Sequence, residues 1–147
     1  MLKILTFPDR KLYTILPFYE GNYQEIKTIS DQMIMTMIFN KGIGLAANQV
    51  GFSIRMFVMG DLSSGFWIIV NPAILNMSTE HENMVEGCLS FPNQKYSVIR
   101  PKVVDVMYYD INGKEIKTQF TGIWARCFLH ELDHLNGLTF DMIGLKI

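Results

Sequence analysis

The segment Cys127–Gly137, CFLHELDHLNG, places two histidines four residues apart with a glutamate directly after the first. On an α-helix of ~3.6 residues per turn, positions four apart lie one above the other on the same face. His130 and His134 can therefore present their imidazoles to one metal ion, and Glu131 can reach a water on that ion without coordinating it. This layout is typical of a metal hydrolase, although an amphipathic core helix can carry the same spacing by chance.

The third ligand does not lie where zinc proteases with HExxH place it, either at a histidine six residues past the second or at a more distant glutamate. Phe140 stands at the histidine position, and no glutamate follows Glu131. Cys127 lies about 7.5 Å along the helix axis from the midpoint of the histidine pair, too far for its short side chain to form a ~2.3 Å metal–sulfur bond. The geometry therefore predicts a structural role for Cys127.

Two other residues are candidates for the third ligand. His81 lies between Glu80 and Glu82 in a polar segment, which favours a solvated side chain. Cys88, in VEGCLSFP, can add a thiolate to the two imidazoles and leave one metal position open for water. Its alternative is a small buried hydrophobe, a common fate of a free cysteine.

A glycine-containing segment, GIGLAANQVG, precedes both motifs at Gly42–Gly51. It follows a predicted helix and has Ala47 at the third glycine position, which disfavours a dinucleotide-binding loop. Its small residues instead allow close backbone approach, and Gln49 can donate an amide hydrogen bond to a developing oxyanion.

Periodicity predicts the elements that position these motifs. Apolar residues at helical spacing indicate a helix from about Gln24 to Asn40, and a final helix is expected between Thr121 and Gly137. The runs 54–60 and 66–71 are expected to be paired strands, and Asn112-Gly113 predicts a tight hairpin. We expect an α+β fold with mostly antiparallel β-sheets packed around a central metal-binding α-helix, plus an N-terminal helix.

Length and composition limit the remaining choices. The 147 residues suit one catalytic domain, 1–147, with 49% apolar residues, 18% charged residues and a net charge of −1. This balance predicts no direct nucleic-acid partner, and no apolar run is long enough for a membrane span or signal peptide. Two cysteines without an export signal favour a cytoplasmic location.

Three motifs in order, GIGLAANQ (Gly42–Gln49), EGCLS (Glu86–Ser90) and HELDH (His130–His134), together resemble the signatures of the peptide deformylase family. The resemblance includes LTFPDRKL, VNPAIL and DHLNG and covers nearly the whole chain. It implies a divalent metal, typically Fe²⁺, with Zn²⁺, Ni²⁺ or Co²⁺ as substitutes. The implied ligands are Cys88, His130 and His134.

The same resemblance implies a reaction and its machinery. The substrate is the N-formyl group on the initiator methionine of a nascent chain, released as formate. Glu131 acts as general base and then acid, and Gln49 and the Leu89 backbone N–H stabilise the oxyanion. Extended peptide is held by backbone groups of Ile43, Gly44 and Gly87. An apolar slot for methionine is expected from four residues, whose spacing also suits a plain core: Ile43, Met84, Ile123 and Cys127.

Three features leave alternatives open. Arg126 stands where the family usually has an apolar residue near the pocket, so its guanidinium either bends to solvent or alters side-chain preference. Glu86 and Asp133 either orient the metal ligands or form ordinary surface ion pairs. Thirteen residues follow His134, without the extended C-terminal helix that docks bacterial members on the ribosome. We therefore expect at most transient ribosome proximity, and a host-cell cytoplasm if the chain is virus-encoded.

Two other functions compete with deformylation. A HExxH metalloprotease would cleave internal peptide bonds, but it leaves EGCLS without a role. A non-catalytic domain would bind only metal or formyl-peptides, but a structural metal site normally closes its fourth position with protein.

Overall fold

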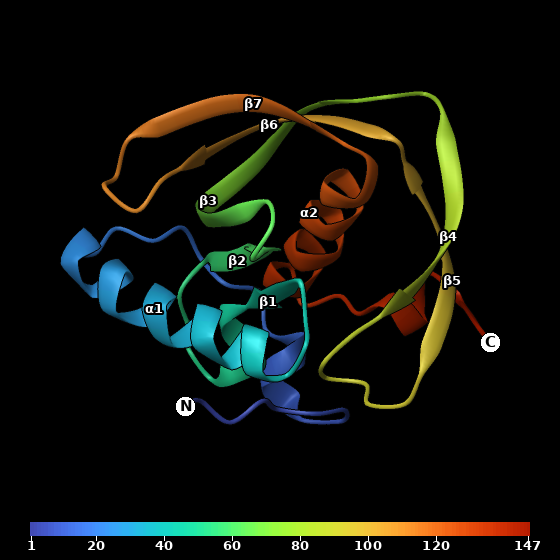
Figure 1. Cartoon of the computed structure of the whole chain (residues 1–147), viewed down its shortest axis with the longest axis horizontal. Helices are drawn as coiled ribbons and strands as arrows, with labels where there is room; N and C mark the ends of the chain where they lie inside the picture. Colours follow the sequence, from blue (N-terminus) through green and yellow to red (C-terminus); the bar gives the residue numbers. More distant parts are fainter.

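The computed structural model describes all 147 residues and has two antiparallel sheets around one helix. One sheet has the order β1-β2-β3-β6-β7 and the other β4-β5-β8. Figure 1 shows α2 at the centre, with the large sheet and α1 to one side and β4 and β5 to the other. The predicted α+β architecture is therefore confirmed.

The elements are α1 (Tyr23–Phe39), β1 (Gly44–Ala46), β2 (Met56–Asp61), β3 (Gly65–Met77), β4 (His81–Gly87), β5 (Lys95–Pro101), β6 (Val103–Tyr109), β7 (Glu115–Thr121), α2 (Gly122–Leu135) and β8 (Leu145–Lys146), with 3-10 turns η1 (Arg10–Tyr13), η2 (Ala47–Val50) and η3 (Phe140–Met142).

Both predicted strand pairs are present in the large sheet. Strands β2 and β3 pair from Met56↔Val70 to Asp61↔Gly65, and β6 and β7 form the hairpin around Gly113, whose φ is 78°. Strand β3 continues past its predicted end to Met77, with register shifts against β6 that allow a strand to bend. Asn71 lies at this bend with a φ of 51°, and its amide bonds the backbone of Tyr19.

Helix α1 matches its prediction within one residue at each end. The Asn22 side chain accepts a hydrogen bond from the Gln24 N–H at 2.8 Å and caps the first turn. The left-handed residue after the helix is Lys41, with a φ of 60°, although Gly42 follows it directly. Neither helix is long and apolar enough to cross a membrane. The buried face of α1 carries the periodic apolar residues Ile26, Ile29, Met33 and Met37.

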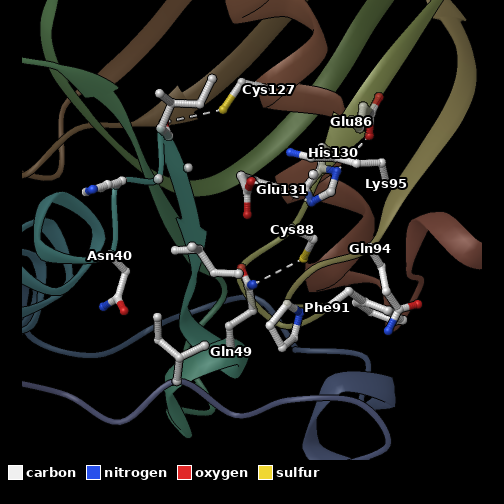
Figure 2. A pocket seen from close by; sticks show the side chains of 18 of the residues that line it. Asn40, Gln49, Glu86, Cys88, Phe91, Gln94, Lys95, Cys127, His130 and Glu131 are labelled. Atoms are coloured by element: carbon white, nitrogen blue, oxygen red, sulfur yellow. Dashed lines mark hydrogen bonds and ion pairs between the residues drawn. The ribbon is translucent and has the colours of Figure 1, made fainter. Parts of the chain in front are cut away.

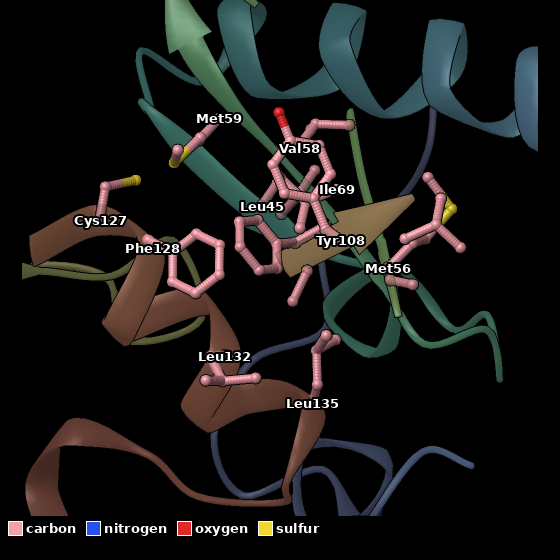
Figure 3. Close-up of a cluster of buried hydrophobic side chains, with 14 of the residues drawn as sticks. Leu45, Met56, Val58, Met59, Ile69, Tyr108, Cys127, Phe128, Leu132 and Leu135 are labelled. Atoms are coloured by element: carbon pink, nitrogen blue, oxygen red, sulfur yellow. The ribbon is translucent and has the colours of Figure 1, made fainter. Parts of the chain in front are cut away.

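Helix α2 has two faces with different roles. One face packs into the main core, where the Phe128 ring meets Phe57 with centroids 5.2 Å apart and Leu132 and Leu135 lie below it (Figure 3). The other face carries the two histidines. Thr121 occupies the N-cap position as predicted, although its side chain makes no capping hydrogen bond. Core packing from Ala125 to Leu135 thus fixes the part of the helix that carries the histidines.

Candidate active site

Cys88 lies just beyond β4, and its side chain meets the two histidines of α2. The Nε2 atoms of His130 and His134 are 3.3 Å apart, and the Cys88 Sγ is 3.4 Å from the His134 Nε2. All three ligand atoms lie within 4.8 Å of one another. A tetrahedral ion with bonds of ~2.1 Å to nitrogen and ~2.3 Å to sulfur needs separations of about 3.4 and 3.6 Å. The three residues therefore fit one divalent metal and leave a fourth position free of protein ligands.

The other two candidate ligands lie outside this cluster. Cys127 is buried, and its thiol donates to the Ile43 carbonyl at 3.5 Å. His81 is exposed on β4, with its Nδ1 2.8 Å from the Thr79 carbonyl. Of the two open readings of Cys88, the ligand position is the one that the structure supports.

Glu86 is buried and orients one of the histidines. Its Oε1 lies 2.8 Å from the His130 Nδ1, so this nitrogen carries the proton and the Nε2 lone pair faces the other ligand atoms. Burial acts to raise the pKa of Glu86, but the hydrogen bonds and charges of His130 and Arg100 outweigh it and hold the pKa at about 2. The surface ion-pair alternative is therefore wrong for Glu86. The Asp133 side chain, by contrast, pairs with Arg100 at 2.9 Å and makes no hydrogen bond to a ligand side chain.

The guanidinium of Arg126 does not point to solvent, so that alternative from the sequence is wrong. Arg126 is only 5% exposed, and its guanidinium donates to the Glu86 carboxylate at 2.5 Å. It also donates to the backbone carbonyls of Val98 at 3.0 Å and Glu82 at 2.7 Å. A buried carboxylate and two backbone carbonyls thus satisfy the guanidinium inside the protein. A signal in the sequence is its spacing, since Arg126, His130 and His134 recur every four residues.

Glu131 provides a free carboxylate oxygen beside the ligand cluster. Its Oε2 is 4.0 Å from the His130 Nε2, and its Oε1 is buried with no hydrogen-bond partner. Burial is the largest influence on this carboxyl and raises its pKa to about 7. A carboxylate with that pKa can both take and return a proton near neutral pH.

Gln49 and Leu89 both line the cleft beside Cys88, and the Gln49 Nε2 also donates to the Ser90 hydroxyl at 3.0 Å. The Gln49 Oε1 accepts from the Ala46 N–H at 2.8 Å, which turns its Nε2 toward Cys88, 3.6 Å from the Sγ (Figure 2). The Leu89 N–H, one residue after the cysteine, donates no hydrogen bond within the chain. Asn48 ties this turn to α2 by donating to the His134 carbonyl at 2.6 Å.

A cleft of about 700 Å³ joins these groups to solvent (Figure 2). It brings together the ligands Cys88 and His130 with most of the predicted substrate-binding residues. Met84 does not line it, and the neighbouring Val85 does, because successive side chains on a strand point to opposite faces. Lining residues that were predicted from the sequence are Ile43, Gly44, Gln49, Gly87, Leu89, Ile123, Arg126, Cys127 and Glu131.

Gly44 allows the closest approach in this cleft, and its replacement is a first test. A Cβ at this position would lie 2.5 Å from the Glu131 Oε2 and 2.7 Å from the Cys127 Sγ. Gly44→Ala should therefore displace the carboxylate and lower kcat/KM at least ~10-fold, since small displacements of reacting groups are costly. As a control, Gly65→Ala, at a φ of 80° with open space around it, should cost only stability. Wild-type kcat/KM in Gly44→Ala would contradict this prediction.

Known proteins match the chain over most of its length. A family model described as polypeptide deformylase matches residues 1–143. The peptide deformylase of Wolbachia sp. subsp. Brugia malayi is 39% identical over 151 residues, which cover 95% of this chain and 84% of that protein. The chain belongs to the peptide deformylase family. Membership shows peptide deformylase activity, and the Cys/His/His cluster agrees with the metal-dependent hydrolysis of this family.

Solved peptide deformylase structures share this fold closely. The crystal structure of peptide deformylase from Thermotoga maritima has a TM-score of 0.93 and 38% identity, and the match covers 97% of each chain. That of a probable peptide deformylase from synechococcus phage S-SSM7 has a TM-score of 0.92 and 37% identity, and covers 97% of this chain and 99% of that one. The deformylase fold therefore extends over almost all of the 147 residues.

Proposed function

We propose that this chain, as a single catalytic domain, removes the N-formyl group from the initiator methionine of nascent polypeptides and uses Fe²⁺ held by Cys88, His130 and His134. The family implies formylated nascent peptides as substrates. The observation that carries the proposal is the unpartnered, buried carboxylate oxygen of Glu131 beside a cluster that supplies only three ligands. Zn²⁺, Ni²⁺ and Co²⁺ suit the same thiolate and imidazole donors, so metal supply decides which ion is bound in the cell.

The residues of the chain divide the chemistry between them. When bound, the metal supplies a water of lowered pKa and polarises the formyl carbonyl. Glu131 accepts the proton of the attacking water and later gives it to the leaving amine, which departs as the free α-amino group. Gln49 and the Leu89 N–H donate hydrogen bonds to the formyl oxygen as it gains negative charge. Each such donor is worth ~3 kcal/mol of barrier.

Peptide binding uses two strands that end at the cleft. Strand β1 is the edge of the large sheet and β4 the edge of the small one, and both contribute lining residues. Backbone groups of Ile43, Gly44 and Gly87 can therefore bind an extended peptide as an added strand would. Ile123, Cys127 and the stem of Arg126 supply apolar surface for the methionine side chain.

Neither competing function has a specific observation in its favour. Cys88, the third member of the ligand cluster, lies in EGCLS. A HExxH metalloprotease would leave this segment without a role. A cytoplasmic location and transient ribosome proximity stay predictions.

Formate release from a short formyl-Met peptide tests the proposal. The protein is prepared anaerobically, reconstituted with Fe²⁺, and assayed beside its metal-free form and an unformylated peptide of the same sequence. We expect formate only from the formylated peptide and only with metal. Cleavage of an internal peptide bond without formate release would instead support a protease.

A further inference from the structure

The Glu86 carboxylate receives four hydrogen bonds, two on each oxygen. Its Oε1 accepts from His130 and from the Arg100 Nη2, at 2.8 and 3.0 Å. Its Oε2 accepts from the Arg100 Nε and the Arg126 Nη1, at 2.6 and 2.5 Å. A carboxylate offers about four lone-pair sites, so this one is fully occupied and can neither rotate nor tilt without losing a bond.

The same network joins the elements that bring the metal ligands together. Arg126 and His130 lie on α2, one helical turn apart, while Glu86 lies on β4. Arg126 also bonds backbone carbonyls on both β4 and β5, through Glu82 and Val98. Since Cys88 follows Glu86 by two residues, these bonds hold the thiolate end of β4 against the helix that supplies the imidazoles.

The formal charges of the network balance only when Arg126 is present. Two guanidinium groups, Arg100 and Arg126, face the two carboxylates Glu86 and Asp133. Arg100 divides its donors between both acids, whereas Arg126 bonds Glu86 alone among them. Removing Arg126 therefore frees one site on the Glu86 Oε2 and leaves this carboxylate with only His130 and Arg100 as partners.

We propose that Arg126 is a positioning residue for the metal site, which acts through Glu86 to fix the His130 imidazole and the approach of Cys88. This inference rests on the proposed ligation of the metal by these residues and extends it outward by two contacts. It also explains why an arginine is compatible with an apolar slot. The charged group is buried against Glu86, while Arg126 also lines the cleft, where the carbons of its stem can supply apolar surface.

The test is the affinity of Arg126→Met for Co²⁺, measured by competition with a chromophoric chelator. Methionine keeps an apolar stem in the cleft but removes every guanidinium hydrogen bond. Loss of partners that orient metal ligands typically costs ~10–100-fold in affinity, and we expect ~10-fold because Arg100 still holds Glu86. A purely electrostatic role predicts the opposite, since removing a cation from beside a dication would tighten binding. Unchanged or tighter Co²⁺ binding would overturn the proposal.

The visible spectrum of bound Co²⁺ gives a second readout that does not depend on turnover. We expect the ligand-field bands of Arg126→Met to shift or broaden, because the ligand geometry is less fixed, and those of Arg126→Lys to lie between mutant and wild type. Arg55→Met is the matched control. Its guanidinium also bonds the α2 region, at the Leu135 carbonyl and Asn136, but has no contact with Glu86. It should lower thermal stability and leave the Co²⁺ spectrum unchanged.

A double-mutant cycle shows whether Arg126 acts through Glu86. In the Glu86→Gln background, Arg126→Met should weaken Co²⁺ binding by less than ~3-fold, because the carboxylate it positions is already gone. An equal loss in both backgrounds would assign Arg126 a general role in stability and overturn the inference. Wild-type protein that binds no metal would instead refute the proposed function, so the two failures are distinguishable.

Discussion

Glu131→Gln should bind its metal as tightly as the wild type while releasing formate about a thousand times more slowly. Glutamine keeps the shape of the side chain but cannot accept or return a proton, and general acid–base groups contribute ~10²–10⁴-fold to rate. Metal binding should persist, because Glu131 is outside the cluster of three ligand atoms. Asp133, the other acid on α2, is paired with Arg100 at 2.9 Å and does not line the cleft.

The experiment compares metal content and single-turnover formate release in the same preparations. Glu115→Gln, an exposed change at the start of β7 and outside the cleft, serves as the control and should match the wild type in both. A Glu131→Gln enzyme with near wild-type turnover would remove Glu131 from the mechanism. Loss of metal together with activity would show that it supports ligation instead.

Cys88→Ser should weaken metal binding by more than ~100-fold, whereas Cys127→Ser should change it by less than ~3-fold. Only the Cys88 sulfur lies beside the imidazoles, and a serine hydroxyl is a poor replacement for a thiolate ligand. Cys127 is directed to the Ile43 carbonyl, a bond that a hydroxyl can also make. Both thiols line the same cleft, Cys88 half-buried and Cys127 buried. The two variants therefore distinguish the cysteine that binds metal from the one that does not.

Zn²⁺ affinity by chelator competition, with thermal unfolding alongside, measures both cysteine variants. The Cys127 variant acts as the internal control for any general effect of losing sulfur from the cleft. Similar metal loss in the two proteins would mean that the third ligand has been assigned to the wrong residue.

Features that depend on local periodicity could be predicted from the sequence. The histidine pair of α2, the hairpin at Gly113 and the buried face of α1 all follow from spacing along one element. Cys88 was harder, because its distance from His134 depends on how β4 packs against α2, and spacing alone left a buried hydrophobe open. The ordered resemblance to three family motifs supported the ligand role.

Other site features could not be predicted because they depend on contacts between elements. Arg126 was expected to face solvent or the substrate, and its buried carboxylate partner becomes visible only when β4 and β5 lie against the helix. Val85 lines the cleft where Met84 was predicted to do so. A shift of one residue along a strand moves a side chain to the opposite face, and the sequence alone did not determine which face of β4 meets the cleft. Glu86 changed from an undecided acid to the partner of His130 for the same reason.

The split origin of the ligands makes metal binding part of folding. Cys88 comes from the end of the small sheet, the histidines come from α2, and α2 itself is anchored in the core of the large sheet. The three ligand atoms meet only while both sheets are docked on the helix, so an ion that binds them favours the docked state by RT ln(1 + [M]/Kd). At a free metal concentration a hundred times Kd, this linkage adds about 2.7 kcal/mol, a large share of the stability of an ordinary domain. The ion thus acts as a reversible cross-link between the two sheets. Loss of the metal is therefore expected to lower the stability of the fold as well as the activity.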